Sequence, residues 1–176
     1  MNTDHNVDAS VEINNQLKGV FSDVRICEDS EFFVVDDVDP VVLGHKLVFT
    51  KSRYSCLAET DAEHLISFVE RQFLPTVLQE YWLLEQGRAK FCTSFNGCTH
   101  AHAHLIPRSQ IDDLQLPAST VDLTLFDALS RLKCGSSYLL WGKIGGGFAY
   151  AEPFVSDEKR IIRNAILRAK GAGIRQ

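Results

Sequence analysis

The sequence predicts an α+β domain in which a long helix packs against an antiparallel sheet of about five strands. Short apolar runs at residues 24–27, 31–35 and 46–49 are separated by polar turns, as in strands joined by hairpins. Apolar residues recur at helical spacing after residue 60. Histidine and alanine alternate over residues 100–104, which is the period-two pattern of a strand. A chain of 176 residues can bury the core that such a domain requires.

The turns between the first three runs indicate how these strands are connected. Polar residues 28–30 form the turn between the first and second runs. Pro40 and Gly44 mark a loop before the third run, because proline lacks an amide donor and glycine tolerates positive φ. We therefore expect the second and third strands to be antiparallel.

A long helix is predicted from residue 60 to about Glu85. Thr60 and Glu63 have the spacing of a capping box, in which both side chains satisfy free amide groups at a helix start. Pro75 should kink the helix or split it in two, because proline cannot donate a helical hydrogen bond, and Gly87 should end it. The apolar residues at helical spacing are Leu65, Ile66, Val69, Phe73, Val77, Leu78 and Tyr81.

A further strand is expected at residues 90–95, directly before the histidines. Asn96 and Gly97 form a strong signal for a tight hairpin turn. This turn should make residues 90–95 the antiparallel neighbour of a strand at 99–107, which Pro107 ends. Asn96 would then lie beside the histidines.

The C-terminal part is expected to add a hairpin and two helices. A short helix is predicted at residues 121–132, followed by strands at 138–141 and 148–150. The glycines at 145–147 favour a hairpin turn over a phosphate-binding loop, because no helix follows them directly. The last helix should start near Ser156 and bury Ile161, Ile162, Ala165, Ile166 and Ala169.

These elements divide the chain into three parts. Residues 1–15 are rich in asparagine, aspartate and serine, and we expect them to be disordered. Residues 16–108 should form the core that carries the histidines. Residues 109–176 should form a C-terminal extension packed on that core.

Composition limits the partners and the compartment. A formal net charge of −5 argues against nucleic acid as a partner, since binding to backbone phosphates needs a basic face. Five cysteines without a CxxC pair indicate reduced thiols. We find neither a signal peptide nor an apolar run of about 20 residues, so we expect a cytoplasmic protein that does not bind membranes.

One strand face is expected to carry three of the six histidines. On a strand, His100, His102 and His104 project from one side, and Ala101 and Ala103 face the core. Such a cluster in an apolar frame is typical of a functional site.

A metal ion is one chemistry that this cluster could support. Neighbouring histidines can share a zinc ion, but a tetrahedral site needs further ligands. No histidine follows His104, and the candidate helpers are His45, Asp37 and Cys98. We expect no metal, and a metal-assisted hydrolase is kept as an alternative.

Attack of a neutral imidazole on phosphorus is the other chemistry. An imidazole with a pKa of about 6.5 has an unprotonated nitrogen near neutral pH. The resulting N–P bond is labile, so water or another acceptor can complete the transfer. Neighbouring imidazoles could orient the nucleophile, hold the phosphate oxygens and protonate the leaving group. No cofactor is required.

Residues 100–106, His-Ala-His-Ala-His-Leu-Ile, resemble the histidine triad motif, in which three histidines alternate with hydrophobic residues. The proline and arginine that follow look like the fragile histidine triad branch of this family. The upstream landmark of the family is also matched, by an acidic, proline-containing segment at residues 33–40 followed by Gly44 and His45. The resemblance covers about residues 24–108.

The resemblance implies a covalent mechanism. His102 would be the nucleophile that forms a nucleotidyl-histidine intermediate, His104 would contact the α-phosphate, and His100 would help to position the nucleophile. The implied protein is a nucleotide-binding hydrolase or nucleotidyltransferase that acts at the α-phosphorus of a nucleoside monophosphate derivative. A nucleotide- or partner-binding module without turnover is the second alternative. The partners implied are a small-molecule nucleotide substrate and a second copy of the chain in a homodimer.

The resemblance also implies the binding residues. Asp37 would accept hydrogen bonds from the ribose hydroxyls, His45 would support the histidines from behind, and apolar residues 32–35 would pack on the base. Many family members carry a longer loop with Gly-Gln before the triad, which holds the leaving side of the phosphate. In this chain Asn96 and Thr99 would take that place, so a nucleoside monophosphate derivative is expected rather than a dinucleoside polyphosphate.

Overall fold

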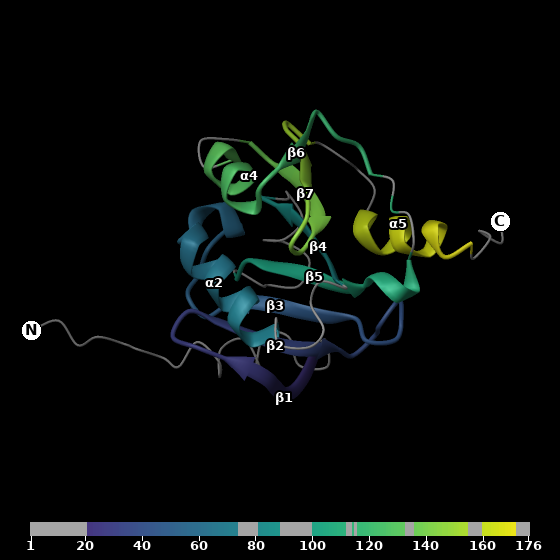
Figure 1. Ribbon diagram of the computed structural model, residues 1–176. Coiled ribbons are helices and arrows are strands. Elements are labelled where there is room, and N and C mark those ends of the chain that lie inside the picture. Colours follow the sequence, from purple (N-terminus) through teal and green to yellow (C-terminus); the bar gives the residue numbers. More distant parts are fainter. Residues whose placement is uncertain are drawn as a thin grey trace, which may run out of the picture.

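The computed structural model contains one antiparallel sheet with helices on both of its faces (Figure 1). It describes residues 21–73, 81–88, 100–111, 114, 116–132, 136–154 and 160–171. Within these ranges the sheet has eight strands, and three α-helices accompany it. The expected antiparallel sheet with packed helices is confirmed, and the expected number of about five strands is wrong.

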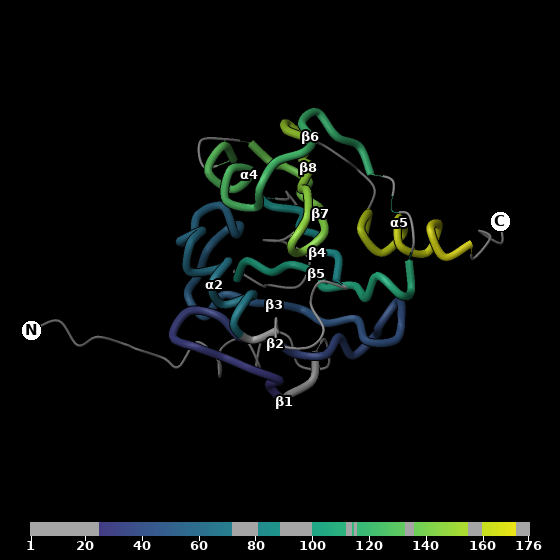
Figure 2. The backbone as a smooth tube through the Cα atoms, in the orientation of Figure 1, coloured from purple at the N-terminus to yellow at the C-terminus, as the bar shows by residue number. Residues whose placement is uncertain are grey.

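The strands lie in the order β1-β2-β3-β5-β4-β7-β8-β6, and each pairing is antiparallel. In Figure 2 the strands follow this order from β1 at the bottom to β6 at the top. The histidine strand, β5, lies inside the sheet between β3 and β4. The bounds are β1 Phe21–Glu28, β2 Phe32–Asp37, β3 Lys46–Thr50, β4 Tyr81–Gly87, β5 His102–Pro107, β6 Thr120–Leu123, β7 Tyr138–Lys143 and β8 Phe148–Ala151.

The helices divide between the two faces of the sheet. In Figure 1, α2 and α4 lie on one side of the strands and α5 lies on the other. Two large apolar clusters agree with this division, because one joins α2 and α4 to the sheet and the other joins α5 to β4, β7 and β8. The bounds are η1 Leu57–Glu59, α2 Ala62–Phe73, η3 Arg108–Gln110, α4 Leu125–Leu132 and α5 Ile161–Ala169.

The expected helix to about Glu85 is wrong, because Tyr81–Gly87 is the strand β4. Residues 81–85 are all buried, since this interior strand has helices over both of its faces. Residues 81–84 are a short apolar run without a polar face, so their periodicity does not distinguish a buried strand from a helix. Residues 74–80, with Pro75, lie outside the described residues.

The expected neighbour of the histidine strand is also different. β4 and β3 flank β5, in place of the strand expected at residues 90–95. Residues 89–99 lie outside the described residues, including the expected hairpin turn at Asn96 and Gly97.

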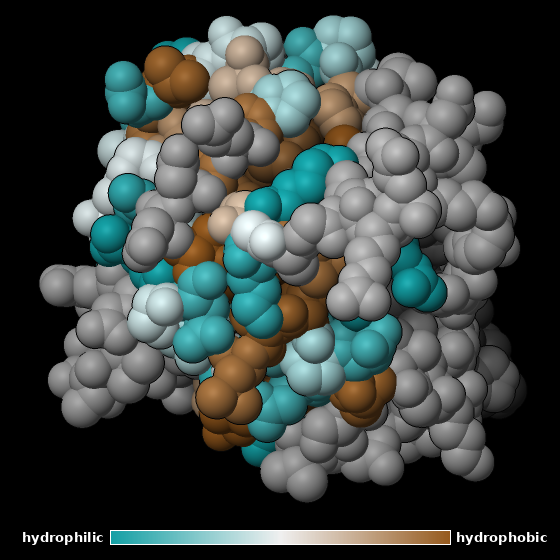
Figure 3. Space-filling view, turned by 90° about the vertical axis from the view of Figure 1, so that its right-hand side faces the viewer, coloured by the Kyte–Doolittle hydropathy of each residue, from teal (hydrophilic) through white to brown (hydrophobic). Residues whose placement is uncertain are grey.

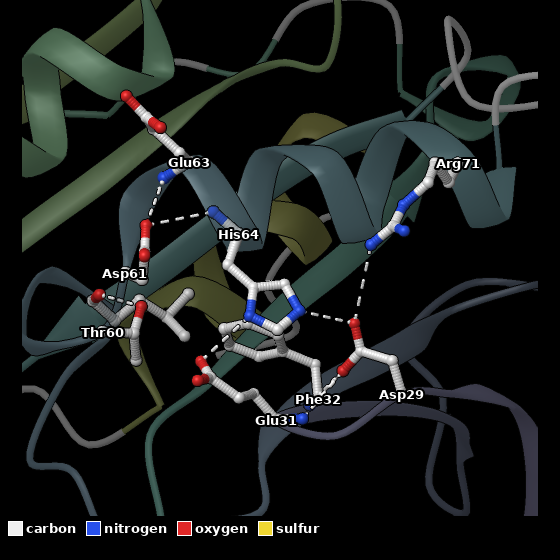
Figure 4. Close-up of polar contacts among 9 residues, drawn as sticks. Asp29, Glu31, Phe32, Thr60, Asp61, Glu63, His64 and Arg71 are labelled. Carbon is white, nitrogen blue, oxygen red and sulfur yellow. Dashed lines mark hydrogen bonds and ion pairs between the residues drawn. The ribbon is translucent and has the colours of Figure 1, made fainter.

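The start of α2 is capped one residue later than expected. The carboxylate of Asp61 accepts hydrogen bonds from the amides of Glu63 and His64, at 2.9 and 3.1 Å. The hydroxyl of Thr60 instead donates to the carbonyl of Leu57 in η1, at 2.6 Å. Figure 4 shows both contacts. Asp61 is therefore the N-cap, the position at which its short side chain can reach these amides.

His64, in the first turn of α2, connects this helix to the turn between β1 and β2 (Figure 4). Its Nε2 lies 2.8 Å from Oδ2 of Asp29, and its Nδ1 lies 3.3 Å from Oε2 of Glu31. The ring also meets the edge of Phe32, with centroids 5.4 Å apart. His64 is therefore a packing residue on the α2 side of the sheet.

The C-terminal elements follow the expectation with two exceptions. The hairpin of β7 and β8 is confirmed, and Gly145 in its turn has a φ of +75°, which glycine adopts without strain. Residues 120–123 form β6 rather than the first turn of the expected helix, so α4 starts at Leu125. α5 buries four of the five expected residues, whereas Ala169 is exposed. Ser156 lies outside the described residues.

A buried carboxyl group joins β4, β7 and η1. Glu85 is 1% exposed, and it accepts hydrogen bonds from the hydroxyl of Tyr138 at 2.6 Å and the amide of Leu57 at 2.7 Å. Burial raises the pKa of Glu85 from 4.5 to about 7, although both hydrogen bonds favour the charged form.

This raised pKa predicts a pH dependence of stability. Between pH 4.5 and about 7 the folded Glu85 keeps a proton that the unfolded chain releases. Its contribution to the free energy of unfolding is therefore present below pH 4.5 and is lost as the pH rises through about 7. We expect the difference in unfolding free energy between wild type and Glu85→Gln to fall over this range in urea titrations. A difference that is constant with pH would contradict the prediction.

The surface mixes apolar and polar side chains (Figure 3). In the part of the chain that the structure describes, the exposed large apolar residues are spread over several elements and a loop, and they are Ile26, Val38, Leu43, Val121, Phe126 and Leu167. Among the described residues, no helix combines the length and the apolar character needed to cross a membrane.

Candidate active site

The alternation on β5 separates the histidines from the core, as expected. Ala101, Ala103 and Leu105 are 4%, 0% and 0% exposed and belong to the cluster under α2 and α4. His102 pairs with Phe49 of β3, and His104 pairs with Leu47. His102 and His104 therefore lie on the opposite face of the sheet, which is the face that α5 covers.

His100 lies two residues before β5 and is held by backbone carbonyls. Its Nδ1 is 3.1 Å from the carbonyl oxygens of both Thr50 and Ser52. Because a carbonyl oxygen only accepts, Nδ1 carries the hydrogen. Burial lowers the pKa of His100, so the ring is neutral near pH 7.

His102, the predicted nucleophile, is half-buried on the α5 face. Its Nδ1 lies 3.5 Å from the carbonyl oxygen of His100, the long limit of a hydrogen bond, and this contact places the hydrogen on Nδ1. Its ring stacks on Phe49 with centroids 5.1 Å apart. Burial lowers the pKa of His102, partly offset by the His100 carbonyl. The ring is therefore neutral, and Nε2 has a lone pair available for attack.

His104 is connected to His45, which lies just before β3. Nδ1 of His104 and Nε2 of His45 share a hydrogen bond of 2.9 Å. Burial holds the pKa of His104 well below its usual value, and His102, His45 and Arg163 lower it further. The fold therefore places the side chain of His45 in contact with the histidine strand.

The other ring nitrogen of His45 has two polar neighbours. Nδ1 lies 3.2 Å from Oδ2 of Asp37 and 3.5 Å from the amide nitrogen of Val41. Burial lowers the pKa of His45 to about 4, although Asp37 opposes the shift, so the ring carries a single hydrogen near pH 7. The closer neighbour is a carboxylate, which only accepts, and this places the hydrogen on Nδ1. Nε2 then accepts from Nδ1–H of His104, whose own Nε2 keeps a lone pair.

Asp37 ends β2, and both of its oxygens have partners. Oδ1 accepts from the amide of Asp39 at 2.9 Å, and Oδ2 faces both His45 and Arg163. The side chain is 8% exposed. A ribose hydroxyl at Asp37 would therefore have to use the remaining lone pairs of these oxygens.

Arg163, on α5, is a site residue that the sequence analysis missed. Its Nη1 lies 3.4 Å from Oδ2 of Asp37, and its Nη2 donates to Oδ2 of Asp39 at 2.8 Å. The sequence around Arg163 shows only a charged residue on an amphipathic helix. It does not indicate a contact with Asp37, which lies more than 100 positions earlier in the chain.

A compact apolar cluster extends from the histidines across β3 and β2. It contains Phe33, Val35, Leu47 and Phe49, and the rings of Phe33 and Phe49 stack with centroids 5.4 Å apart. Of the segment expected to pack on a base, Phe33 and Val35 face the histidines. Phe32 and Val34 point to the helical core, because side chains alternate along the strand.

The residues proposed for a metal alternative also come together in part. Asp37, His45 and His104 each offer one ligand atom, and these atoms lie within 4.8 Å of one another. Cys98, the other candidate ligand, lies outside the described residues, as do Asn96 and Thr99.

The chain matches no protein-family model and no curated protein. Among solved structures, a Hit-like protein involved in cell-cycle regulation from Bartonella henselae is 21% identical, with a TM-score of 0.37, over 60% of this chain and 81% of that one. A hypothetical protein from Leishmania major is 21% identical, with a TM-score of 0.39, over 70% and 90%. A hypothetical histidine triad nucleotide-binding protein from Sulfolobus tokodaii is 18% identical, with a TM-score of 0.36, over 93% and 91%. None of these likenesses assigns a role to a residue of this chain.

The arrangement combines three chemical capacities. His102 presents a neutral nitrogen with a defined tautomer. His104 presents a second nitrogen that can accept a proton, with His45 and Asp37 behind it to stabilise the resulting charge. The apolar cluster next to them gives the site a buried apolar wall, in which Phe33 and Phe49 are only 1% and 2% exposed.

Proposed function

We propose that the chain is a histidine triad enzyme that hydrolyses or transfers at the α-phosphorus of a nucleoside monophosphate derivative through a covalent nucleotidyl-histidine intermediate. The observation that carries the proposal is the state of His102. Its hydrogen is on Nδ1, its pKa is lowered by burial, and its Nε2 is an uncharged nucleophile.

The reaction would proceed in two displacements. Nε2 of His102 attacks phosphorus, the N–P bond forms, and the bond from phosphorus to the leaving group breaks with its electron pair. A protonated neighbouring imidazole gives its proton to the leaving group, which completes the first step. Water or another acceptor then attacks phosphorus and gives its proton to the same imidazole, and His102 recovers its lone pair as the N–P bond breaks. His104 would hold a phosphate oxygen, and His100 would orient His102.

His104 could serve this role although its pKa is low in the free protein. An entering phosphate brings negative charge into a buried site, and a nearby negative charge favours the protonated imidazole. His104 would then donate from Nε2 to phosphate while Nδ1 donates to His45. The carboxylate of Asp37 would stabilise this charge through the ring of His45.

The direct test is a product screen with a chelator arm. The full chain is incubated with an adenosine phosphoramidate, an adenosine phosphosulfate and a dinucleoside polyphosphate, and released adenosine monophosphate is measured. We expect release from the first two, unchanged after dialysis against chelator. Activity that chelator abolishes and zinc restores would favour the metal-assisted hydrolase at Asp37, His45 and His104. Nucleotide binding without release would favour the module without turnover.

Asp37 would contribute to ribose recognition. We expect Asp37→Ala to weaken ribonucleotide binding by about 1.5–3 kcal/mol, the scale of hydrogen bonds to a charged group, and deoxyribonucleotide binding by less. Asp37→Ala also removes a contact of His45 and Arg163, which should weaken the binding of both nucleotides equally. The difference between the losses of ribonucleotide and deoxyribonucleotide affinity therefore isolates the ribose contact. Equal losses in calorimetric titrations would remove Asp37 from this role. The expected homodimer and the expected phosphate contacts of Asn96 and Thr99 stay predictions.

A further inference from the structure

An unbroken series of polar contacts leads from the C-terminal helix α5 to the histidine strand. Arg163 lies 3.4 Å from Asp37, Asp37 lies 3.2 Å from His45, and His45 shares a 2.9 Å hydrogen bond with His104. We propose that Arg163 is a positioning residue that holds Asp37 against His45 and thereby fixes which ring nitrogen of His104 carries the hydrogen. The catalytic consequence rests on the proposed function, whereas the tautomer itself does not.

The placement of Arg163 suits this role. α5 lies on the same face of the sheet as the histidines, and its buried residues Ile162 and Ile166 fix the helix on either side of the arginine. The outer partner, Asp39, is 78% exposed, so its ion pair contributes little. The inner partner, Asp37, is 8% exposed, and there the position of the guanidinium determines where the carboxylate points.

Two groups compete for Nδ1 of His45. The carboxylate of Asp37, at 3.2 Å, requires a hydrogen on Nδ1, whereas the amide of Val41, at 3.5 Å, can donate only to a bare Nδ1. A neutral imidazole satisfies one of them at a time. Arg163 favours the first arrangement, because its Nη1, 3.4 Å from Oδ2 of Asp37, holds this oxygen beside Nδ1 of His45.

The tautomer of His45 determines the tautomer of His104. With the hydrogen on Nδ1 of His45, Nδ1–H of His104 donates to Nε2 of His45, and Nε2 of His104 is free to accept a proton. If the amide of Val41 instead donates to Nδ1 of His45, the hydrogen of His45 is on Nε2 and is donated to Nδ1 of His104. The hydrogen of His104 is then on its own Nε2. In the second arrangement, Nε2 of His104 carries the hydrogen and Nδ1 accepts from His45. His104 then has no free nitrogen for a further proton, and Asp37 no longer accepts a hydrogen bond from His45.

The test compares Arg163→Met with Lys170→Met in the full chain. Lys170 directly follows α5 as its C-cap residue and contacts the loop between β2 and β3, at the carbonyl of Val41 3.5 Å away. We measure ring nitrogen chemical shifts of His45 and His104 by NMR, together with kcat and KM. We expect wild type and Lys170→Met to show Nδ1-protonated rings, and Arg163→Met to shift both rings toward the Nε2 tautomer. For Arg163→Met, kcat should fall about tenfold, the scale for residues that orient a site residue from behind, with KM within about threefold.

Wild-type ring shifts in Arg163→Met would overturn the proposal. A change toward the Nε2 tautomer in Lys170→Met as large as that in Arg163→Met would overturn it as well. If Arg163→Met does not fold, Arg163→Lys decides. It keeps the charge and loses the planar fork, so it should give a smaller shift in the same direction, and an unchanged pattern would overturn the proposal. A wild type without turnover refutes the proposed function and leaves the NMR result to decide on Arg163.

Discussion

We expect His102→Asn to lower turnover by several orders of magnitude while nucleotide affinity stays within about tenfold, or about 1.4 kcal/mol, of wild type. Binding interactions around the substrate cannot replace the attacking nitrogen, so the loss falls on the chemical step. Rapid quench with labelled nucleotide should trap an acid-labile adduct on the wild type and none on the variant.

His64→Asn is the matched control for this experiment. His64 is a half-buried histidine on the opposite side of the sheet, bound to Asp29. Its replacement should leave both the adduct and the turnover in place. A wild type that binds nucleotide but forms no adduct and no product from any of the three substrate classes would refute the enzyme proposal.

The first part of the sheet could be predicted from local patterns. The runs at residues 24–27, 31–35 and 46–49 lie within β1, β2 and β3 apart from the turn residue Glu31, because polar turns bound them on both sides. The strand count failed where this signal is missing. β4 begins with an unbroken apolar run at residues 81–84, and β6 is too short to show a period.

The N-caps of α2 and α4 both differ from the predicted helix starts. Thr60 fits the capping pattern, but Asp61 makes the hydrogen bonds. At α4, Thr124 accepts from the amide of Asp127 at 3.0 Å and its hydroxyl donates to the Asp127 carboxylate at 2.7 Å. This reciprocal pair was present in the sequence as Thr-x-x-Asp, and it would have placed β6 outside the helix.

Some contacts of the candidate site could be predicted from the sequence, and others could not. Alternation alone predicts that His102 and His104 share a face, and in the structure both lie on the face of the sheet that α5 covers, with His45 in contact with His104. The contact of Arg163 depends on how α5 packs, and the competition at His45 involves a backbone amide, that of Val41. Neither contact can be predicted from the residue types, because the sequence does not distinguish this arginine from a solvent-facing one or this amide from that of any other loop residue.

Replacement of His104 should have a different signature from that of His102. We expect His104→Ala to weaken nucleotide binding by about 1.5–3 kcal/mol, through loss of a charge-assisted hydrogen bond to phosphate, and to lower turnover by about 10²–10⁴-fold, the scale of general acid–base catalysis. Calorimetric titration with a non-hydrolysable nucleotide gives the first quantity, and single-turnover kinetics give the second.

His45→Phe provides the comparison for His104, because it removes the hydrogen-bond partner and keeps an aromatic ring in the buried position. Since His45 acts through His104, the double variant should lose little more activity than His104→Ala alone, whereas independent residues would give additive losses. Additive losses in this cycle would separate His45 from His104. Unchanged affinity in His104→Ala would remove His104 from the phosphate, and the phosphate contact would then have to come from another part of the chain.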